Sequence, residues 1–188
     1  MAVKRGFSTE ANWYSRSLRA EMRIKAHEKI CPFALAKHLE IPVYAMSSFM
    51  GDIPSAVEFF SSDEGCRMLS AVTIFLQNNK RVIIHNDAHD PKRQAANIAH
   101  EIAHALLLHP PKPPFDENGA RDYSPELEEE ANLLGPALLI SEEAALWIAR
   151  NGWPLEKASQ IYGASEELVR MRLNLCGAYR RVNRGRAA

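Results

Sequence analysis

The sequence predicts an α+β fold that is mainly helical and carries one small antiparallel β-sheet. Two observations lead to this class. Apolar residues recur at helical spacing over most of the chain, whereas β-branched and apolar residues concentrate in two neighbouring runs, Met68–Leu76 and Arg81–His85. The 188 residues, 46% of them hydrophobic and 24% charged, are enough for one main core of a globular protein.

Two helices are expected in the N-terminal region. Apolar positions recur at helical spacing from about Trp13 to Leu39, and Pro32 divides this stretch into a longer and a shorter helix. Pro42 disfavours a helical conformation of the residue before it, so the chain leaves these helices in extended form. Between residues 45 and 66 the pattern is mixed and predicts only one short helix.

The sheet and the first long helix are expected next. The two β-rich runs lie on either side of the polar segment Gln77–Lys80, which predicts a turn and hence an antiparallel hairpin. Asp90 and Pro91 then supply an N-cap and a proline at the first helical position. They begin a helix that is expected to run to about Leu108. His109–Tyr123, which contains four prolines, follows as a surface loop.

The C-terminal half is expected to be helical. Ser124 and Pro125 repeat the capping pattern and begin a second long helix, in which Gly135-Pro136 predicts a kink because a proline lacks the N–H that the helix needs. Three short helices are expected after this second long helix, over Glu142–Arg150, Leu155–Tyr162 and Ser165–Leu175. The arginine-rich C-terminus that follows predicts a solvated helix face and a frayed tail rather than a DNA contact.

Composition argues against several classes of protein. The 23 basic residues balance the 23 acidic ones, so no overall basic field indicates nucleic-acid binding. Cys31, Cys66 and Cys176 are odd in number and show no CxxC spacing, which argues against a disulfide framework or a cysteine zinc site and for a reducing cytoplasm. The N-terminus has no apolar targeting segment, and no run of about 18 apolar residues occurs, so neither secretion nor membrane spanning is expected.

One helical segment carries a metal-binding pattern, His100-Glu101-Ile102-Ala103-His104. Residues four apart lie about 40° apart around a helix, so His100 and His104 project toward one point, as two ligands of one zinc ion require. In zinc peptidases with this HExxH spacing, the glutamate does not bind the metal but takes a proton from the attacking water. Glu101 is therefore the expected catalytic base.

The pattern is short, and a solvated helix face can carry two histidines and a glutamate by chance. The surrounding residues favour the metal site. Apart from the motif itself, the residues from Ile98 to Leu106 are apolar, so unpaired polar groups among them would be costly if buried. A metal ion would account for all three polar side chains at once.

A catalytic zinc site needs a third protein ligand and an open position. Nine residues separate His109 from His100, which predicts that His109 lies on the far side of the helix. Asp116 and Glu117 would be poorly held in the proline-rich loop. The donors considered downstream of the motif are His109, Asp116, Glu117, Asp122, Glu126, Glu128, Glu129 and Glu130.

Glu128 is the preferred third ligand. Asn132 follows it by one helical turn, so a carboxylate and an amide share a face, as a ligand and an orienter of a ligand histidine would. Glu130 is about 200° away from Glu128 around the helix and is expected to face solvent or to pair with a base. The alternative is an ordinary acidic first turn, which the helix dipole favours.

Two segments together resemble the ImmA/IrrE family of metallo-endopeptidases: IAHEIAHALLLH at Ile98–His109 and ELEEEANLLGPALLI at Glu126–Ile140. The resemblance covers about Leu35–Gly177 and implies a zincin-like fold, with a β-hairpin before the ligand helices and short helices after them. Two departures stand out. The family usually has alanines in place of Gly135-Pro136 and Met-Pro in place of Ile140-Ser141.

The resemblance also implies the roles of the site residues. It makes His100, His104 and Glu128 the metal ligands, Glu101 the catalytic glutamate and Asn132 the asparagine of the second motif. Zinc is the implied metal, with manganese as the other possibility. Residues 1–140 would form the metallopeptidase domain, and residues 141–188 a C-terminal helical segment with a basic tail.

A substrate class follows from the resemblance as well. Members of this family typically cleave a transcriptional repressor, often one encoded beside them on a mobile element or in a stress-response operon. The implied function is that of a cytoplasmic, zinc-dependent endopeptidase whose partner is a repressor encoded nearby. An exposed edge of the hairpin would let such a substrate bind as an added strand.

Some assignments stay open from sequence. The group that stabilises the oxyanion is expected among His85, His89, Arg121 and Tyr123. One competing function is a non-catalytic module that binds a metal or a regulator, in the manner of an antitoxin. Another is a DNA-binding helix-turn-helix over Leu155–Leu175, although two acids and two arginines in its recognition helix suit phosphate contact poorly.

Overall fold

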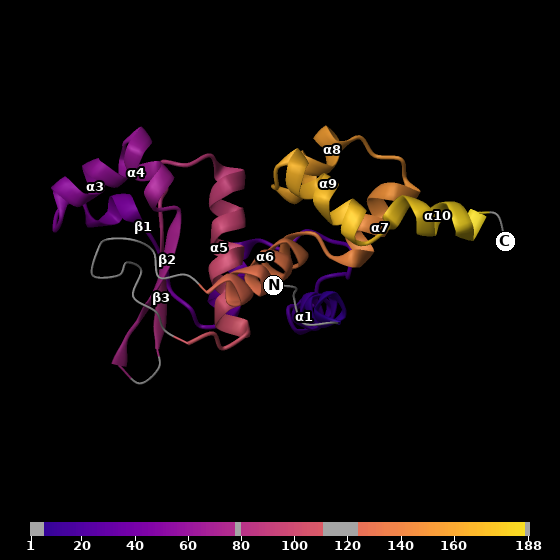
Figure 1. Cartoon of the computed structure of the whole chain (residues 1–188), viewed down its shortest axis with the longest axis horizontal. Coiled ribbons are helices and arrows are strands. Elements are labelled where there is room, and N and C mark those ends of the chain that lie inside the picture. The colour runs from indigo at the N-terminus through magenta and orange to yellow at the C-terminus, as the bar shows by residue number, and fades with distance from the viewer. Residues whose placement is uncertain (1–5, 78–79, 111–123, 187–188) are drawn as a thin grey trace.

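The computed structural model describes residues 6–77, 80–110 and 124–186, and it confirms the mainly helical α+β class. The predicted turn at Gln77–Lys80 lies partly, and the predicted loop at His109–Tyr123 mostly, outside the described residues. Figure 1 shows the sheet and the C-terminal helices at opposite ends of the molecule, with two long helices between them. The described elements are α1 (Phe7–Glu21), α2 (Pro32–His38), β1 (Val43–Ala45), η1 (Met46–Phe49), α3 (Pro54–Ser61), α4 (Asp63–Met68), β2 (Ala71–Phe75), β3 (Arg81–His85), α5 (Pro91–Leu106), α6 (Pro125–Leu139), α7 (Glu142–Arg150), α8 (Leu155–Tyr162), α9 (Glu166–Leu175) and α10 (Ala178–Arg186).

Within the described residues, the sheet has three strands in the order β1-β3-β2. The predicted hairpin is present: β2 and β3 are antiparallel, with Thr73 opposite Ile83. β1 pairs with the other edge of β3 in parallel, with Val43 opposite Ile83. The sequence predicted only an extended segment there, because three residues are too few to show an alternating pattern. β2 is thus left as an edge strand of this sheet.

The segment between β1 and β2 is more helical than predicted. One short helix was expected there, and the structure has η1, α3 and α4 instead. Pro54 begins α3 at the first helical position. Ser62 then caps α4, because its hydroxyl accepts a hydrogen bond from the Gly65 amide at 3.1 Å. Met68, expected in the strand, ends α4. A small apolar cluster built on Met46, Val57 and Leu69 packs these helices against the sheet.

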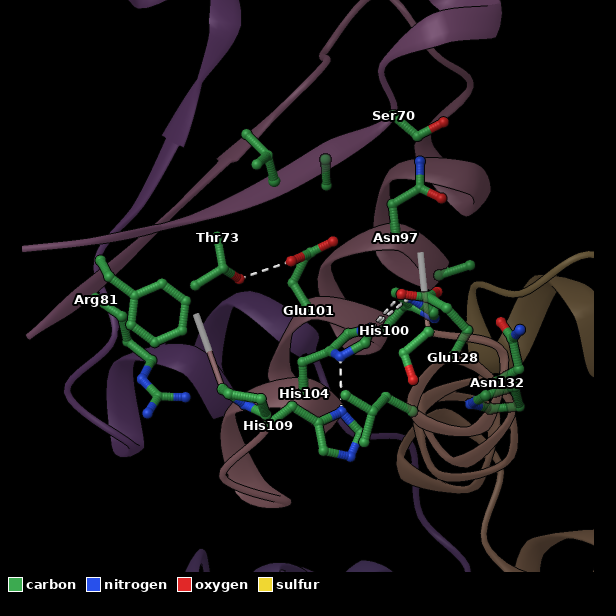
Figure 2. A pocket seen from close by; sticks show the side chains of 18 of the residues that line it. Ser70, Thr73, Arg81, Asn97, His100, Glu101, His104, His109, Glu128 and Asn132 are labelled. Atoms are coloured by element: carbon green, nitrogen blue, oxygen red, sulfur yellow. Dashed lines mark hydrogen bonds and ion pairs between the residues drawn. The ribbon is translucent and has the colours of Figure 1, made fainter. Parts of the chain in front are cut away.

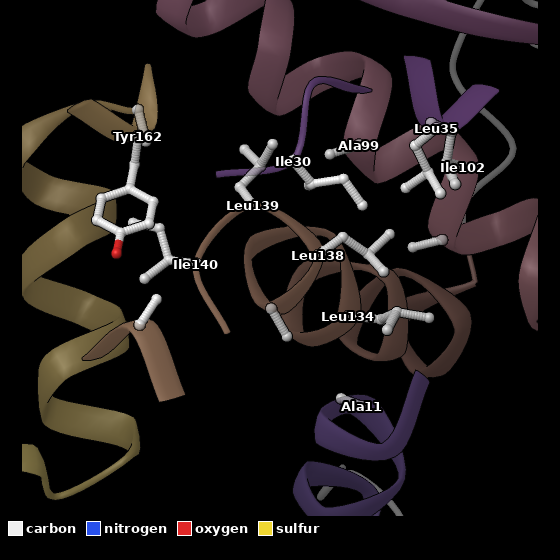
Figure 3. Packing of buried hydrophobic residues seen from close by; sticks show 14 of the residues in the cluster. Ala11, Ile30, Leu35, Ala99, Ile102, Leu134, Leu138, Leu139, Ile140 and Tyr162 are labelled. Carbon is white, nitrogen blue, oxygen red and sulfur yellow. The ribbon is translucent and has the colours of Figure 1, made fainter. Parts of the chain in front are cut away.

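α5 and α6 form the centre of the molecule. α5 begins as predicted, since the Asp90 side chain accepts a hydrogen bond from the Lys92 amide at 2.8 Å. The two helices approach each other closely at Gly135, where a Cβ atom would lie 3.1 Å from the Cα and N atoms of His100. Only glycine fits that contact without displacing a backbone. Figure 3 shows Leu134 and Leu138 of α6 in the same buried cluster as Ala99 and Ile102 of α5.

The C-terminal end of α6 is capped by side chains from distant parts of the chain. The last carbonyls of a helix have no partner within it. Here Arg19 of α1 donates to the carbonyls of Leu138 and Leu139, at 2.9 and 3.2 Å. Arg172 of α9 donates to the carbonyl of Ile140 at 2.8 Å. Both arginines are buried, and burial lowers the pKa of Arg19 to about 10.

The C-terminal helices share the main core. One apolar cluster runs from Phe7 to Val182 and includes residues on both sides of position 140. α10 corrects the predicted frayed tail: Val182 is buried, and Arg181 donates to the Glu142 carboxylate of α7. Because Arg172 is buried, it is not available to contact phosphate from the proposed recognition helix. Among the described residues, no helix has the length and apolar character needed to cross a membrane.

Candidate metal centre

Three of the side chains singled out from the sequence meet between α5 and α6. His100 and His104 lie one turn apart on α5, and their Nε2 atoms are 3.0 Å from each other. Glu128, in the first turn of α6, places its two carboxylate oxygens 3.2 Å from His100 Nε2 and 3.4 Å from His104 Nε2. Figure 2 shows the three side chains directed toward one point from the two helices. In the part of the chain that the structure describes, this is the group of residues arranged to hold a metal ion.

The geometry of this group fits zinc. Two imidazole nitrogens and one carboxylate oxygen are a usual set of protein ligands for a catalytic zinc ion. Ligand atoms at about 2.05 Å from a tetrahedral ion are separated by roughly 3.3 Å. The separation of the two histidine nitrogens, 3.0 Å, and their separations from the two different oxygens of Glu128, 3.2 and 3.4 Å, lie close to that value. These residues would hold such an ion without rearrangement of the helices.

The carboxylate of Glu128 is held in its ionised form. Hydrogen bonds from His100 and His104 keep the pKa of Glu128 well below its usual range, against the opposing effect of partial burial. A ligand carboxylate must be deprotonated to bind a metal. The fold thus prepares Glu128 for that role.

Glu101, the predicted base, points to the opposite side of α5 from the core and reaches the sheet. Thr73 of β2 donates a hydrogen bond from its hydroxyl to Glu101 Oε2, at 2.6 Å. Figure 2 shows this contact bridging the strand and the helix beside the three ligands. The sequence did not single out Thr73, because 28 residues separate it from Glu101 and no local pattern links them. The bond fixes one oxygen of the carboxylate.

His109 lies elsewhere than the sequence predicted. It was expected on the far side of a continuing helix, but α5 ends at Leu106 and Leu108 adopts a left-handed conformation with φ 54°. The chain turns back, and His109 Nδ1 lies 2.8 Å from His104 Nδ1. Its Nε2 is 3.2 Å from Glu130 Oε2, so Glu130 pairs with a base, one of the two alternatives predicted for it.

Asn132, the predicted orienter, is exposed and lines the same cavity as the ligands. Among the described residues, no hydrogen bond joins it to His100 or His104. A different amide stands out instead. Asn97, one turn before Glu101 on α5, also lines the cavity, and its Nδ2 is buried with no partner in the described residues. It is an unpaired donor in the wall of the cavity.

Two of the four residues considered for stabilising the oxyanion lie among the described residues. His85 and His89 are both buried, and burial lowers the pKa of each. Neither lines the cavity around the three ligands. Arg121 and Tyr123 lie outside the described residues. The oxyanion assignment therefore stays a prediction.

The ligands face a cavity of about 460 Å³. Its walls come from five elements, namely β2, β3, α5, α6 and, through Leu168, α9. At one end, Arg81 stacks over Phe75, with its guanidinium carbon 5.0 Å from the ring centroid. A helix of the C-terminal segment thus contributes an apolar wall to the site of the two long helices.

This constellation is typical of a metallopeptidase centre, with an HExxH helix, a glutamate from the next helix beside its two histidines and a strand beside Glu101. Comparison with protein families identifies which one. The family described as the IrrE N-terminal-like domain, Peptidase M78, matches residues 62–174, more than half of the chain. The chain belongs to this family, which confirms the resemblance found in its sequence. Searches of curated proteins and of solved structures find no match.

Proposed function

We propose that this chain is a zinc-dependent endopeptidase that cuts a regulatory protein, and that this protein is a transcriptional repressor encoded nearby. The observation that carries the catalytic part is the convergence of His100, His104 and Glu128 beside Glu101 in one cavity. The repressor and a cytoplasmic site of action are supported by the family resemblance and the composition.

The proposed chemistry divides among a few side chains. His100, His104 and Glu128 would hold the ion. When bound, zinc supplies Lewis acidity, which makes water a stronger nucleophile near neutral pH and polarises a carbonyl group. Glu101 takes the proton from the attacking water and delivers it to the leaving amine. The hydrogen bond from Thr73 leaves one oxygen of Glu101 free for this proton.

The edge strand β2 offers a place for an extended substrate. The Asn86 amide donates to the Ser70 carbonyl and the Leu76 amide to the Lys80 carbonyl, which fixes which main-chain groups face β3. In this antiparallel register the main-chain groups of Ala71, Thr73 and Phe75 point away from β3. A peptide paired with these groups would run beside Glu101, with its side chains alternating between the cavity and the surface.

The test of catalysis compares wild type with Glu101→Gln, each loaded with zinc and each treated with a chelator. The substrate is a repressor encoded beside the gene. We expect the substitution to reduce cleavage by about 10²–10⁴-fold while zinc binding persists, because a positioned base contributes on that scale. Glu126→Gln, an exposed carboxylate of the same charge on α6, serves as the matched control and should cut normally.

Each outcome decides a different part of the proposal. Cleavage that survives both the chelator and Glu101→Gln would remove the peptidase assignment. Zinc binding without any cleavage of the repressor or of unfolded protein would favour the non-catalytic module instead. Cleavage of other proteins but not of the repressor would leave the peptidase and reject its substrate.

Strand addition has its own test. Proline replacements are introduced one at a time along the segment that is cut, on both sides of the bond. Since proline has no N–H to donate, alternate replacements should block cleavage and those between them should be tolerated. Equal cleavage of all the proline variants would show that the substrate does not pair with β2.

A further inference from the structure

We infer that His109 and Glu130 form a two-residue relay that positions the metal ligand His104 by fixing which of its ring nitrogens carries the proton. This inference rests on the proposed function, because it takes His104 to be a ligand. His109 and Glu130 are positioning residues in it, and neither is proposed to touch the metal or the substrate.

The atoms of His104 have distinct partners. Its Nε2 faces the ligand cluster, 3.0 Å from His100 Nε2 and 3.4 Å from Glu128 Oε1. Its Nδ1 faces the other way, 2.8 Å from Nδ1 of His109. A neutral histidine that offers Nε2 to a metal carries its proton on Nδ1. The Nδ1–H of His104 therefore has His109 Nδ1 as its acceptor.

The same reasoning fixes the next step. If His109 Nδ1 accepts a hydrogen bond, the proton of this second ring lies on Nε2. That atom is 3.2 Å from Glu130 Oε2, which accepts its hydrogen bond as a carboxylate. Each group in the chain from Glu130 through His109 to His104 then has one possible role as donor or acceptor. The opposite direction would place a proton on His104 Nε2, the atom that would have to bind the metal.

His109 is built into the fold rather than exposed near the site. Only 7% of its surface is accessible, less than for any of the three ligands or Glu130. The turn that brings it back requires Leu108 to adopt φ 54° while its side chain is 77% exposed. This conformation costs a non-glycine residue roughly 1–2 kcal/mol. The Leu108 side chain gains little burial there, whereas the turn places the His109 ring against His104.

His109 does not act as a fourth ligand in this arrangement. Its Nδ1 contacts the Nδ1 of His104, the nitrogen on the side of that ring opposite the one that faces Glu128. The group able to hold a metal among the described residues contains His100, His104 and Glu128 without it. Ligand histidines commonly donate their second N–H to a carboxylate or carbonyl; here a histidine backed by a carboxylate would take that place.

The test uses three substitutions of the same residue, made in a Glu101→Gln background so that no peptidase activity is needed. His109→Asn places an amide oxygen near the position of Nδ1 and keeps an acceptor for His104. His109→Gln places its amide near the position of Nε2 and keeps a group for Glu130 instead. His109→Phe keeps the ring and removes both. Zinc affinity is measured by competition with a chelator, after the metal-free fold is checked by circular dichroism and thermal unfolding.

We expect His109→Phe and His109→Gln to weaken zinc binding by about 10- to 100-fold, the range found when outer partners of metal ligands are removed. His109→Asn should retain most of the affinity. In the zinc-loaded parent, nitrogen-15 NMR should find the proton of His104 on Nδ1, and its exchange with water should be faster in His109→Phe. Glu130→Gln should weaken zinc binding less than His109→Phe, and Glu126→Gln not at all.

Wild-type zinc affinity in all three His109 variants would overturn the inference and leave the metal site intact. Equal losses for His109→Asn and His109→Gln would also overturn it, because they would show that the ring only fills space. If the parent protein itself binds no zinc, the proposed function fails instead. The two failures are therefore distinguishable.

Discussion

α6 takes part in two polar networks, a buried one at its C-terminal end and a partly exposed one at its N-terminal end, and they differ in how their polar groups are paired. At its C-terminal end, Arg19 donates five hydrogen bonds, to the side chain and carbonyl of Ser15 and to the carbonyls of Glu28, Leu138 and Leu139. Each donor meets a fixed acceptor. The network is saturated, as buried polar groups in a stable core are.

At the N-terminal end of α6, the polar atoms that face the site pair only with one another and converge on one point. His100 Nε2, His104 Nε2 and the Glu128 oxygens lie within 3.4 Å of one another, and all three groups serve as acceptors when they bind a metal. Converging lone pairs repel one another unless a cation lies between them. The comparison gives a criterion: a saturated buried network stabilises the fold, whereas convergent acceptors mark a binding site.

The largest expected effect tests the saturated network. Arg19→Met removes the donors for the Leu138 and Leu139 carbonyls and should lower the free energy of unfolding by about 3 kcal/mol, because each unpaired buried carbonyl is costly. Denaturant unfolding measures this. Zinc affinity of the folded protein should not change. Arg16→Met, on the same helix, is the control and should cost less than about 1 kcal/mol, since its salt bridge to Glu143 is exposed.

If Arg19→Met lowers the free energy of zinc binding as much as the free energy of unfolding, the two ends of α6 are energetically coupled. The distinction between a stabilising network and a binding site would then not hold. If the stability loss of Arg19→Met is no larger than that of Arg16→Met, the carbonyls of Leu138 and Leu139 form hydrogen bonds with water in the variant. Arg19 would then not be the cap that its geometry indicates.

Local chemistry explains what the sequence could predict. Asp90 and Pro91 mark the start of α5 by the same hydrogen bond that the structure shows, and the four-residue spacing of His100 and His104 fixes their common direction on any helix. Glu128 could be chosen because a helical turn separates it from Asn132, although the structure gives Asn132 no bond to the ligands among the described residues. These inferences needed only periodicity within one helix.

The features that the sequence did not predict depend on contacts between elements. Thr73 meets Glu101 only because β2 packs against α5. His109 reaches His104 only because a leucine adopts a left-handed conformation, which propensity reserves mainly for glycine. The sequence explained Gly135-Pro136 only as a predicted kink, whereas the structure places Gly135 directly against the backbone of α5. Tertiary contacts of this kind leave no pattern in neighbouring residues.

The next expected effect links the two ends of α6. Gly135→Ala places a Cβ atom 3.1 Å from backbone atoms of His100, too close to be accommodated without a shift of one helix. The cost in stability, about 1–2 kcal/mol, is partly offset by the gain of about 1 kcal/mol in helix propensity. Zinc affinity should fall by about tenfold, because the ligands of α5 and α6 move apart.

Unfolding with denaturant and zinc competition separate these two effects. Gly51→Ala is the control, since a Cβ atom there meets nothing within 4 Å. Unchanged zinc affinity in Gly135→Ala would mean that α5 and α6 separate without disturbing the ligands, and that close approach at this point serves packing alone.

The smallest expected effect concerns the link between the site and the sheet. Thr73→Val keeps the shape of the side chain but removes the hydrogen bond to Glu101, which is worth about 1 kcal/mol. The expected result is a fall in kcat of about fivefold with zinc affinity unchanged, because the carboxylate acts on substrate and not on the metal. Thr73→Ser restores the hydroxyl and should restore most of the rate. A loss of zinc affinity in Thr73→Val, or a rate that serine does not rescue, would place Thr73 among the residues that support the fold and not among those that orient the base.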